Sequence, residues 1–513
     1  MTPFQAMQIH PADNTATLVV DGKAGDEIVV AQGETRFSIK LIEDVPFAHK
    51  AAVRAIEPGE AVMKYGEVMG RASGPIAMGA WVHVHNVESC RGRGDEAQVG
   101  DRGLKPEDRP DPANAHRMTT AAPIFSADGR EFRGYLRPDG LAGTRNLVGV
   151  LSTVVCANDV TEALGGEPGA AAFTHQQGCS QTRPDVEGIE RTLFNLAMNP
   201  NLGGVLLVSL GCESVNAPKI YERIRAAGKP VEMIVIQEAG GKERALRAGR
   251  EAIARLRDAI RAEPTMLPIS RLRVGLKCGS SDTTQGISSN IIIGRMTEAL
   301  VEAGAQVVIG ETTEFMGAEH IAARHAVDDA TAEAIVGAVE RMENRARAIG
   351  VDMRGGQPTR GNIEGGLTTI EEKSLGALAK AGSAVFQAVV PYGVPSKKQG
   401  LVMMDSPGRE PELLTGLAAM GCTIVVFATG RGAPQGFPFM PVVKITGNAR
   451  TWERMREHMD VYVGDVISGE KTNEAAALDV FEHVLAAASG EPTAAERTGY
   501  FRSMNIYTTG PVI

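Results

Sequence analysis

Cysteine and aromatic side chains are scarce in this chain. Six cysteines among 513 residues are too few for a disulfide framework, so we expect free thiols in a reducing compartment. No CxxC pair is present, so a closed structural zinc site is not expected. Aromatic residues make up only 4% of the sequence, which argues against a stacking platform for nucleic-acid bases.

An excess of positive charge and long apolar runs are also missing. The 53 basic and 62 acidic residues give a formal net charge of −9, which argues against binding to nucleic acid or to an anionic membrane. No run approaches the roughly 20 apolar residues of a membrane-spanning helix, and the N-terminal sequence lacks a signal-peptide pattern. We expect a cytoplasmic protein with neither nucleic-acid nor membrane partners.

Glycine, by contrast, is abundant at 59 residues, and the chain is long enough for about two to four domains. Short extended runs separated by turn residues predict a small β-rich domain at 1–88, followed by a polar linker at 89–131. Alternating strand and helix patterns predict α/β domains at 132–265 and 266–513, with Rossmann-like, mostly parallel sheets. Ligands bind such sheets at the carboxyl ends of the strands.

Three cysteines fall at predicted strand ends. Cys179, Cys212 and Cys278 each stand beside a glycine and close an apolar run. Three thiolates from separate loops can hold one iron ion, or three irons of a cluster whose fourth iron stays open to substrate. Alternatively, the cysteines are small apolar residues of a core. The sequence leaves both interpretations open.

Imidazole and carboxylate groups accompany these cysteines. His175, four residues before Cys179, fits a general base, a metal ligand or a hydrogen bond to a loop carbonyl. The carboxylates at strand ends fit acid–base catalysis or metal binding, and equally helix caps and salt bridges. These carboxylates are Glu213, Asp282, Glu311 and Glu314.

Two histidines stand two residues apart in a predicted strand at 80–85. On a strand, His83 and His85 project their imidazoles from the same face. Such a pair fits a two-point grip on a metal ion, or an ordinary hydrogen-bonded pair near a domain edge.

Glycine corners supply candidate anion sites. Arg145 and Asn146 follow one such corner, and a guanidinium there suits a carboxylate. The glycine-rich segment 361–374 enters a helix whose free amides favour an anion, although it lacks the ending of a Walker A motif. A further corner begins at Thr429 and contains Arg431.

Several of these residues belong to ordered motifs of one family. In the N-terminal part the motifs are IHPADN, AHK, KYGEVMG and HVHN, and in the rest GTRN, THQQGCS, GCE, KCGSSD, GAE, GN…GGLTTIEEKSLG and TGRGAPQG. From residue 8 to the C-terminus the chain resembles the altronate/galactarate dehydratases, which begin with a SAF (β-clip) domain. HVHN, GCSQ and GAE are more similar to the altronate branch.

The resemblance implies loss of water from a sugar acid to give a 2-keto-3-deoxy acid, with Fe²⁺, mononuclear or in an iron–sulfur cluster, and Mn²⁺ as a possible substitute. Its implied metal ligands are drawn from His83, His85, Cys179, Cys212 and Cys278. Its candidate catalytic residues are His175, Glu213, Asp282, Glu311 and Lys373. Its candidate substrate-binding residues are Arg145, Asn146, Asn362, Gly365, Gly366, Thr429 and Arg431. The expected partners are a small sugar acid and further copies of the chain in a homo-oligomer.

The chain departs from the family pattern near the expected pocket, at Ser280, at residues 288–291 and at Ile363. These departures bear on the identity of the substrate more than on the reaction. One alternative is a sulfo-lyase that acts on a sulfonated hydroxy acid. Another is a non-catalytic protein that binds sugar acids.

Overall fold

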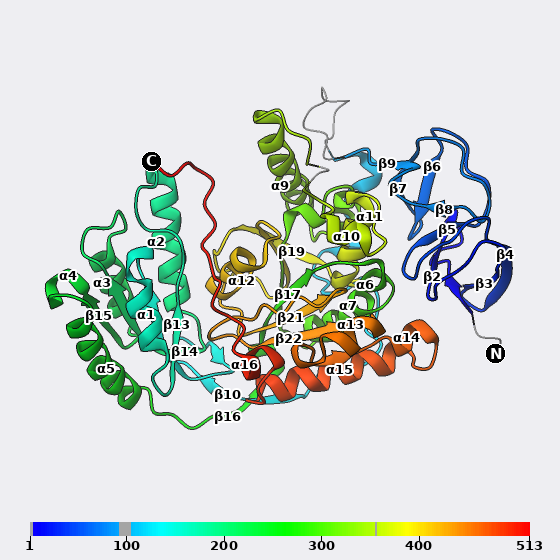
Figure 1. Ribbon diagram of the computed structural model, residues 1–513. Coiled ribbons are helices and arrows are strands. Elements are labelled where there is room, and N and C mark those ends of the chain that lie inside the picture. The colour runs from blue at the N-terminus through cyan, green and yellow to red at the C-terminus, as the bar shows by residue number, and fades with distance from the viewer. Residues whose placement is uncertain (1–3, 92–103, 354–355) are drawn as a thin grey trace.

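The computed structural model describes residues 4–91, 104–353 and 356–513. Three bodies lie in a row (Figure 1): the N-terminal β-rich domain at the right, the C-terminal α/β domain in the centre and a smaller α/β domain at the left. The mixed α/β fold predicted from the sequence is confirmed. Within the described ranges, no helix has the length and apolar character needed to cross a membrane.

The N-terminal domain consists of two small sheets. The six-stranded sheet has the order β4-β3-β1-β2-β5-β8, and the three-stranded sheet has the order β6-β7-β9. Their strands are β1 (Ala6–Met7), β2 (Thr15–Leu18), β3 (Glu27–Gln32), β4 (Thr35–Lys40), β5 (Lys50–Ala52), β6 (Ala61–Lys64), β7 (Glu67–Ala72), β8 (Trp81–Val82) and β9 (Val87–Glu88). The tight β3–β4 hairpin turns at Gly33, whose φ of +57° costs glycine little.

The predicted strand at 80–85 is wrong beyond Val82. The side-chain oxygen of Asn86 accepts the backbone N–H of His83 at 2.9 Å, and the Asn86 N–H donates to the His83 carbonyl at 3.0 Å. These bonds close a turn, so His83 and His85 do not share a strand face: His83 is buried and His85 is exposed.

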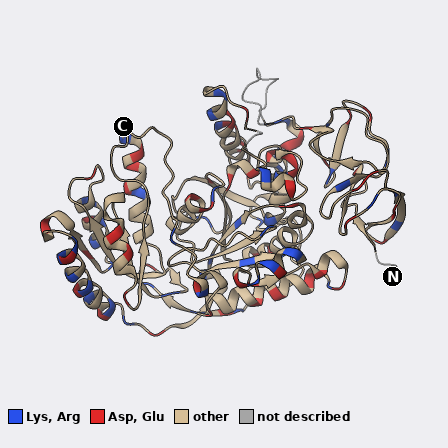
Figure 2. Ribbon diagram, in the orientation of Figure 1, with Lys and Arg blue, Asp and Glu red and all other residues tan. Residues whose placement is uncertain are grey.

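The second domain is a parallel sheet between two helical layers. Its strand order is β13-β12-β14-β15. All eight residues of β14 are buried, as expected for a parallel strand covered on both faces. Helices α1 and α5 pack on one face, and α2 and α3 on the other. The elements are β12 (Leu147–Ser152), α1 (Asn158–Gly165), β13 (Ala170–Phe173), α2 (Arg183–Ala197), β14 (Leu202–Ser209), α3 (Ala217–Ala226), β15 (Val231–Val235), α4 (Ile236–Ala239) and α5 (Lys242–Ala259). Figure 2 shows charges of both signs along the outer helix α5.

The C-terminal domain contains a seven-stranded parallel sheet of order β19-β20-β18-β17-β21-β22-β23. The strands are β17 (Arg273–Gly279), β18 (Gln306–Ile309), β19 (Phe386–Pro391), β20 (Gly400–Asp405), β21 (Ile424–Thr429), β22 (Val442–Thr446) and β23 (Val461–Tyr462). The first strand, β17, is central, with β18 on one side and β21 on the other. Strand order therefore reverses at β17, which is where open α/β sheets bind ligands.

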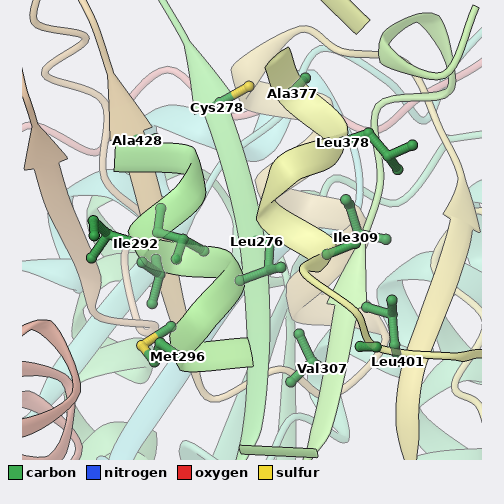
Figure 3. Close-up of a cluster of buried hydrophobic side chains, with 14 of the residues drawn as sticks. Leu276, Cys278, Ile292, Met296, Val307, Ile309, Ala377, Leu378, Leu401 and Ala428 are labelled. Carbon is green, nitrogen blue, oxygen red and sulfur yellow. The ribbon is translucent and has the colours of Figure 1, made fainter. Parts of the chain in front are cut away.

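Helices bury both faces of this sheet. The main helices are α6 (Thr283–Ile287), α7 (Ser289–Glu302), α8 (Glu319–Arg324), α9 (Asp329–Ala348), α10 (Arg360–Glu364), α11 (Ile370–Leu378), α12 (Glu410–Ala419), α13 (Ala449–Arg454), α14 (Asp465–Ser468), α15 (Asn473–Ala488) and α16 (Ala494–Thr498). Figure 3 shows the core around Leu276 of β17, packed against Ile292 and Met296 of α7 and Val307 of β18. Cys278 lies at the end of β17 near Ala377 of α11.

The two α/β domains are joined by a small antiparallel sheet, in which β10 (Glu131–Leu136) pairs with β11 (Ala142–Gly143) and β16 (Thr265–Pro268). Residues 92–103 of the predicted linker lie outside the described residues. The rest of the linker packs on the C-terminal domain. There the Asn114 side chain donates to the Arg324 carbonyl at 3.0 Å, and Thr119 forms a β-bridge with Ala384.

Candidate active site

The sequence-predicted site residues fall into separate groups in the structure. His175, Cys179, Cys212 and Glu213 lie at the carboxyl edge of the four-stranded sheet. Asp282, Glu311, Lys373 and Cys278 lie at the carboxyl edge of the seven-stranded sheet, in the neighbouring domain. His83 and His85 belong to the N-terminal domain. Within the described ranges, no three of these thiols and imidazoles have donor atoms within 4.8 Å of one another, so the structure does not bring them together at one centre.

A buried charge cluster follows β17. The Cys278 sulfur lies 3.0 Å from Glu314 Oε2 and 2.8 Å from Lys380 Nζ, and that ammonium is 2.9 Å from Glu314 Oε2. Lys277 Nζ contacts Glu311 Oε1, and the Cys278 N–H donates to Glu311 Oε2 at 3.0 Å. None of these five side chains is more than 4% exposed. The cluster balances two carboxylates with two ammonium groups around one thiol.

The cluster separates the pKa values of its two carboxylates. Burial, and then the charge of Glu314, raise the pKa of Glu311 to about 7. Burial alone would raise the pKa of Glu314, but Lys380, Lys373 and Lys277 outweigh it and lower that pKa to about 2. Burial and the Glu314 charge raise the pKa of the Cys278 thiol far above its usual range. Near neutral pH, therefore, Cys278 is protonated, Glu314 is ionised and Glu311 titrates.

A small void lies beside this cluster, at the junction with the N-terminal domain. It has a volume of about 10 Å³, and its lining includes Tyr65, Cys278, Asp282, Glu372 and Lys373. Buried polar atoms without a hydrogen-bond partner among the described residues belong to three of its lining residues, Ser281, Gln285 and Asn290, and to Thr283 and Ser289, which stand next to lining residues in the sequence. These atoms are Ser281 Oγ, Thr283 Oγ1, Gln285 Nε2, Ser289 Oγ and Asn290 Oδ1. Because buried polar groups are normally paired, this concentration makes the void a candidate site for a polar ligand.

Backbone strain concentrates in the same region. Of the six non-glycine residues with positive φ in the described ranges, four belong to segments around the void or the charge cluster. They are Ala48 (φ +66°), Tyr65 (+63°), Ser280 (+45°) and Glu311 (+69°). Such conformations are uncommon outside glycine and cluster at functional sites.

The N-terminal domain docks on this region through a buried ion triad. Lys50 Nζ and Lys64 Nζ lie 2.9 and 2.7 Å from the two carboxylate oxygens of Glu372, and Lys50 also donates to the Gly366 carbonyl at 2.5 Å. Burial would raise the pKa of Glu372, but the two lysines lower it to about 2. Burial lowers the pKa of Lys50 to about 8. The triad therefore fixes the position of the void between two domains.

His83 lies beside this triad as a neutral ring. It stacks on Trp81, contacts His49 edge-on and lies 3.4 Å from Thr368 Oγ1. Burial, and then Lys50, lower its pKa to about 3. His83 therefore serves the packing of the two domains, and with His85 exposed the pair does not form a two-point metal grip.

The two glycine loops predicted to bind substrate converge on Asp282. Asn362 Nδ2 donates to the Ser281 carbonyl at 2.9 Å. A Cβ on Gly365 would come within 2.7 Å of Asp282 Cβ, and one on Gly430 within 2.3 Å of its carboxylate. The Asp282 carboxylate caps α6 and accepts bonds from Thr284 Oγ1 at 2.6 Å and Asn448 Nδ2 at 2.7 Å. Burial raises its pKa.

The outer part of these loops has structural contacts. Thr429 Oγ1 accepts the backbone N–H groups of Gly432 and Ala433. Arg431 is exposed, pairs with Glu364 at 3.1 Å and donates to the Gly361 carbonyl. These residues hold the two loops together beside Asp282.

The structure does not support the prediction that Arg145 and Asn146 bind the substrate. Both residues precede β12 and so lie at the amino end of the sheet, opposite the ligand-binding edge. Arg145 pairs with Glu496 at 2.9 Å and donates to backbone carbonyls, while Asn146 Nδ2 donates to the Ile260 carbonyl at 2.8 Å. Arg145 therefore joins the two α/β domains, and Asn146 makes its contacts within the second domain.

The structure also does not support the prediction that His175 is the general base. It is fully buried, its Nε2 lies 2.9 Å from the Ser152 carbonyl, and its Nδ1 accepts the Gln177 N–H at 3.1 Å. Burial lowers its pKa to about 4. Both ring nitrogens are therefore engaged, and His175 supports the loop that carries Cys179.

Glu213 is likewise held by its neighbours. It accepts hydrogen bonds from Ser209 Oγ, Thr153 Oγ1 and the Gly211 N–H at 2.6, 2.7 and 2.7 Å. Burial opposes ionisation, but these bonds outweigh it and lower the pKa of Glu213. The carboxylate therefore fastens the loop that follows β14.

The charge cluster does not fit a divalent metal ion. Donor atoms of Cys278, Glu311 and Glu314 lie within 4.8 Å of one another, as ligands of one ion would. The ammonium groups of Lys277 and Lys380, however, already lie against these donors. A divalent ion would have to displace two buried cations from their partners. No step is therefore assigned to a metal at this cluster.

Some buried side chains of this candidate site were missed by sequence reasoning. Lys277 and Lys380 are buried at the centre of the cluster, and Lys50, Lys64 and Glu372 form the docking triad. The sequence did hold a signal for Lys277. It lies within the strand β17, and a strand covered on both faces buries all of its side chains, including a lysine. Lys380 carried no comparable signal, because its position in a short 3₁₀ turn gives no periodicity.

Comparison with known proteins agrees with this organisation. Three family descriptions match in order: the altronate/galactarate dehydratase SAF domain at 4–90, the D-galactarate dehydratase/altronate hydrolase second domain at 134–261, and the D-galactarate/altronate dehydratase C-terminal domain at 269–512.

Two relatives match over nearly the full length of this chain, and a third matches over part of it. The altronate dehydratase of Escherichia coli (strain K12) is 32% identical over 99% of each chain. The galactarate dehydratase (L-threo-forming) of the same organism is 29% identical over 99% of this chain and 97% of its own. The (2R)-sulfolactate sulfo-lyase subunit beta of Chromohalobacter salexigens is 36% identical over 72% of this chain and 96% of its own. The protein is thus a carbon–oxygen hydro-lyase that belongs to the D-galactarate/altronate dehydratase family.

Proposed function

We propose that the protein dehydrates an altronate-type aldonate or a galactarate-type aldarate to a 2-keto-3-deoxy acid, and that the reaction takes place in the void between the SAF domain and the C-terminal domain. The observation that carries this proposal is the concentration of unpaired buried polar atoms beside a thiol–carboxylate–lysine cluster, at the point where the strand order reverses.

Charge favours the void over a larger hollow nearby. That hollow, of about 510 Å³, is lined by five carboxylates but by only two basic side chains, Arg91 and Lys105. The charged groups that line the void or pair beside it are Lys50, Lys64, Lys277, Lys373, Lys380, Asp282, Glu311, Glu314 and Glu372. Here lysines outnumber carboxylates, which suits an acidic substrate.

Three residues that line the void supply the chemistry. Lys373 Nζ lies 3.7 Å from Glu314 and 2.6 Å from Gln357, and it binds the substrate carboxylate. Asp282 accepts the proton from C2, since its raised pKa makes it a stronger base than an exposed aspartate. Cys278 gives its thiol proton to the departing C3 hydroxyl, which leaves as water, and Lys380, at 2.8 Å, stabilises the thiolate. The enol that remains becomes the 2-keto acid when C3 gains a proton, and Cys278 regains a proton from solvent. A positioned acid or base contributes roughly 10²–10⁴-fold.

Tyr65 controls access to the void. The Tyr65 side chain is partly buried. Its hydroxyl oxygen would lie 2.1 Å from a Cβ placed on Gly286, so the ring packs directly over that glycine. A void of about 10 Å³ holds no more than about one water molecule. Substrate therefore enters with the Tyr65 ring displaced from Gly286.

The test is an anaerobic assay of altronate and galactarate with 2-keto acid as the readout, with Fe²⁺ and with Mn²⁺ as added ions. Lys373→Met is expected to lower turnover at least about 100-fold. The matched control is Arg360→Met, since Arg360 pairs with Glu364 on the exposed surface. Equal turnover by wild type and Lys373→Met would refute the assignment of the void.

Sulfite elimination is a second candidate function. It is favoured by the 36% identity to the sulfo-lyase beta subunit, together with the alpha subunit of the same organism, which is 37% identical over 16% of this chain. The same residues would expel sulfite in place of hydroxide. Release of sulfite from (2R)-sulfolactate, without keto-acid formation from altronate or galactarate, would select this candidate.

A further inference from the structure

Three exposed cysteines follow three neighbouring strands of the second domain. Cys156 comes after β12, Cys179 after β13 and Cys212 after β14. β12 lies between the other two strands and runs parallel to both, so all three cysteines are at one carboxyl edge. The dehydration site proposed above uses none of them.

The three loops are fastened to one another next to the cysteines. The N–H of Val155 donates to the Gln177 carbonyl at 2.9 Å, which joins the Cys156 loop to the Cys179 loop. The Ser214 N–H donates to the Gly178 carbonyl at 2.9 Å, and the Ser180 N–H to Ser214 Oγ at 3.2 Å, which join the Cys179 loop to the Cys212 loop. Each thiol therefore lies within two residues of a bond between loops.

The backbone at this edge is strained and closely packed. Gly178 has a φ of +108°, and a Cβ there would come within 2.5 Å of the Thr153 carbonyl oxygen. Ser180, beside Cys179, is one of the six non-glycine residues with positive φ in the described part of the chain. His175 and Glu213 stabilise the same loops through the hydrogen bonds described above. Such strain persists only where the surroundings enforce it, and it is common at ligand sites.

The thiol chemistry of the three cysteines and the distances between their sulfur atoms indicate what kind of metal group they could bind. Three thiolates form a soft donor set, which suits zinc, copper(I) or an iron–sulfur cluster. In tetrahedral coordination, a metal–sulfur distance of about 2.3 Å brings the sulfurs of one ion to about 3.8 Å from each other. In the described ranges, the three thiols do not form a group within 4.8 Å. They are therefore spaced too widely for one ion, whereas a cluster binds each thiolate through a different iron.

We propose that Cys156, Cys179 and Cys212 bind a [4Fe–4S] cluster through three of its irons, leaving the fourth iron to an oxygen ligand such as a carboxylate or hydroxyl group. On binding, each thiol loses its proton and forms one iron–sulfur bond. Helices α1, α2 and α3 begin a few residues after the three cysteines, so their N-termini lie at the same edge of the sheet, where the helix dipole favours an anionic group.

The experiment is anaerobic reconstitution of the full-length protein with Fe²⁺ and sulfide, followed by analysis of bound iron and sulfide and by electron paramagnetic resonance after reduction. The wild type is expected to bind about four irons and four sulfides. Cys156→Ser, Cys179→Ser and Cys212→Ser are each expected to lose most of the iron and the resonance. Cys90→Ser is the control, since Cys90 is exposed but lies in the N-terminal part of the chain.

Alkylation of the folded protein gives a second readout that does not depend on the variants. Cluster binding protects Cys156, Cys179 and Cys212 from alkylation and leaves Cys90 reactive, as mapped by mass spectrometry. The proposal is overturned if Cys156→Ser keeps its iron and sulfide, if a single metal ion binds without sulfide, or if the three thiols stay reactive after reconstitution.

Discussion

The ammonium group of Lys380 lies between the thiol of Cys278, at 2.8 Å, and the carboxylate of Glu314, at 2.9 Å. All three side chains are buried. The same ammonium is thus the nearest cation to the Glu314 carboxylate, ahead of Lys373 at 3.7 Å, and it is placed to stabilise a thiolate of Cys278.

Lys380→Met leaves Glu314 buried without its nearest cation. Because removing one partner of a buried ion pair leaves an uncompensated charge, we expect the C-terminal domain to lose about 3–5 kcal/mol of its free energy of unfolding. The measurement is urea denaturation followed by circular dichroism. Adding Glu314→Gln should restore part of the loss, because the unpaired charge is then gone. A single variant as stable as wild type would contradict the pairing.

Glu311 makes stability depend on pH. Its pKa is raised from 4.5 to about 7 in the folded protein, chiefly by burial. The folded state therefore holds a proton that the unfolded state has released between these values. The contribution of Glu311 to stability is complete below about pH 4.5 and is lost as the pH rises through about 7.

Glu311→Gln isolates this contribution. Urea denaturation of wild type and variant between pH 5 and pH 8 gives a difference in free energy of unfolding at each pH. We expect wild type to lose stability relative to the variant as the pH rises across this range. A difference that is constant with pH, or that changes in favour of wild type, would contradict the raised pKa.

Gly286 is required because Tyr65 occupies the space over it. In Gly286→Ala the new Cβ would lie 2.1 Å from the Tyr65 hydroxyl oxygen, so we expect a loss of about 1–3 kcal/mol in the free energy of unfolding. Tyr65→Phe removes that oxygen and should recover part of the loss in the double variant. Gly74→Ala is the control, because a Cβ at Gly74 has nothing within 4 Å among the described residues. Equal destabilisation of the single and double variants would rule out this contact.

Much of the fold could be predicted because parallel strands leave a clear signal. Apolar runs such as Leu202–Ser209, separated by amphipathic helices, predict a sheet covered on both faces. Two elements gave no such signal. α12 is buried along most of its length, so it lacks a helical period, and the four apolar residues at 401–404 of β20 are too few to distinguish strand from helix.

The site was predictable only in part for the same kind of reason. Cys278 lies at the end of β17, Asp282 follows β17 and Glu311 follows the neighbouring strand β18. The three residues therefore lie at one edge of the sheet, and such strand ends can be found from sequence. Which strands share a sheet cannot be found that way, so Cys212 was grouped with Cys278 although the two belong to different sheets. Buried lysines such as Lys380 were missed because lysine is ordinarily exposed.

The docking triad gives the last prediction. In Glu372→Gln the ammonium groups of Lys50 and Lys64 stay buried without a carboxylate, so the contact between the SAF domain and α11 is weakened. We expect amide hydrogen exchange to rise at 48–52, 62–66 and 365–373 while the sheet around β17 keeps its protection. Turnover should fall as well, because the void loses the wall that carries Tyr65.

The matched control is Lys23→Met, which removes an exposed ion pair with Asp44 in the same domain and should leave exchange at the junction unchanged. A Glu372→Gln protein with wild-type exchange at all three segments would show that packing alone holds the domains together. If exchange rose at the junction while turnover stayed at the wild-type level, the reacting groups would have to lie away from the SAF domain. The two measurements therefore test the docking and the location of the chemistry separately.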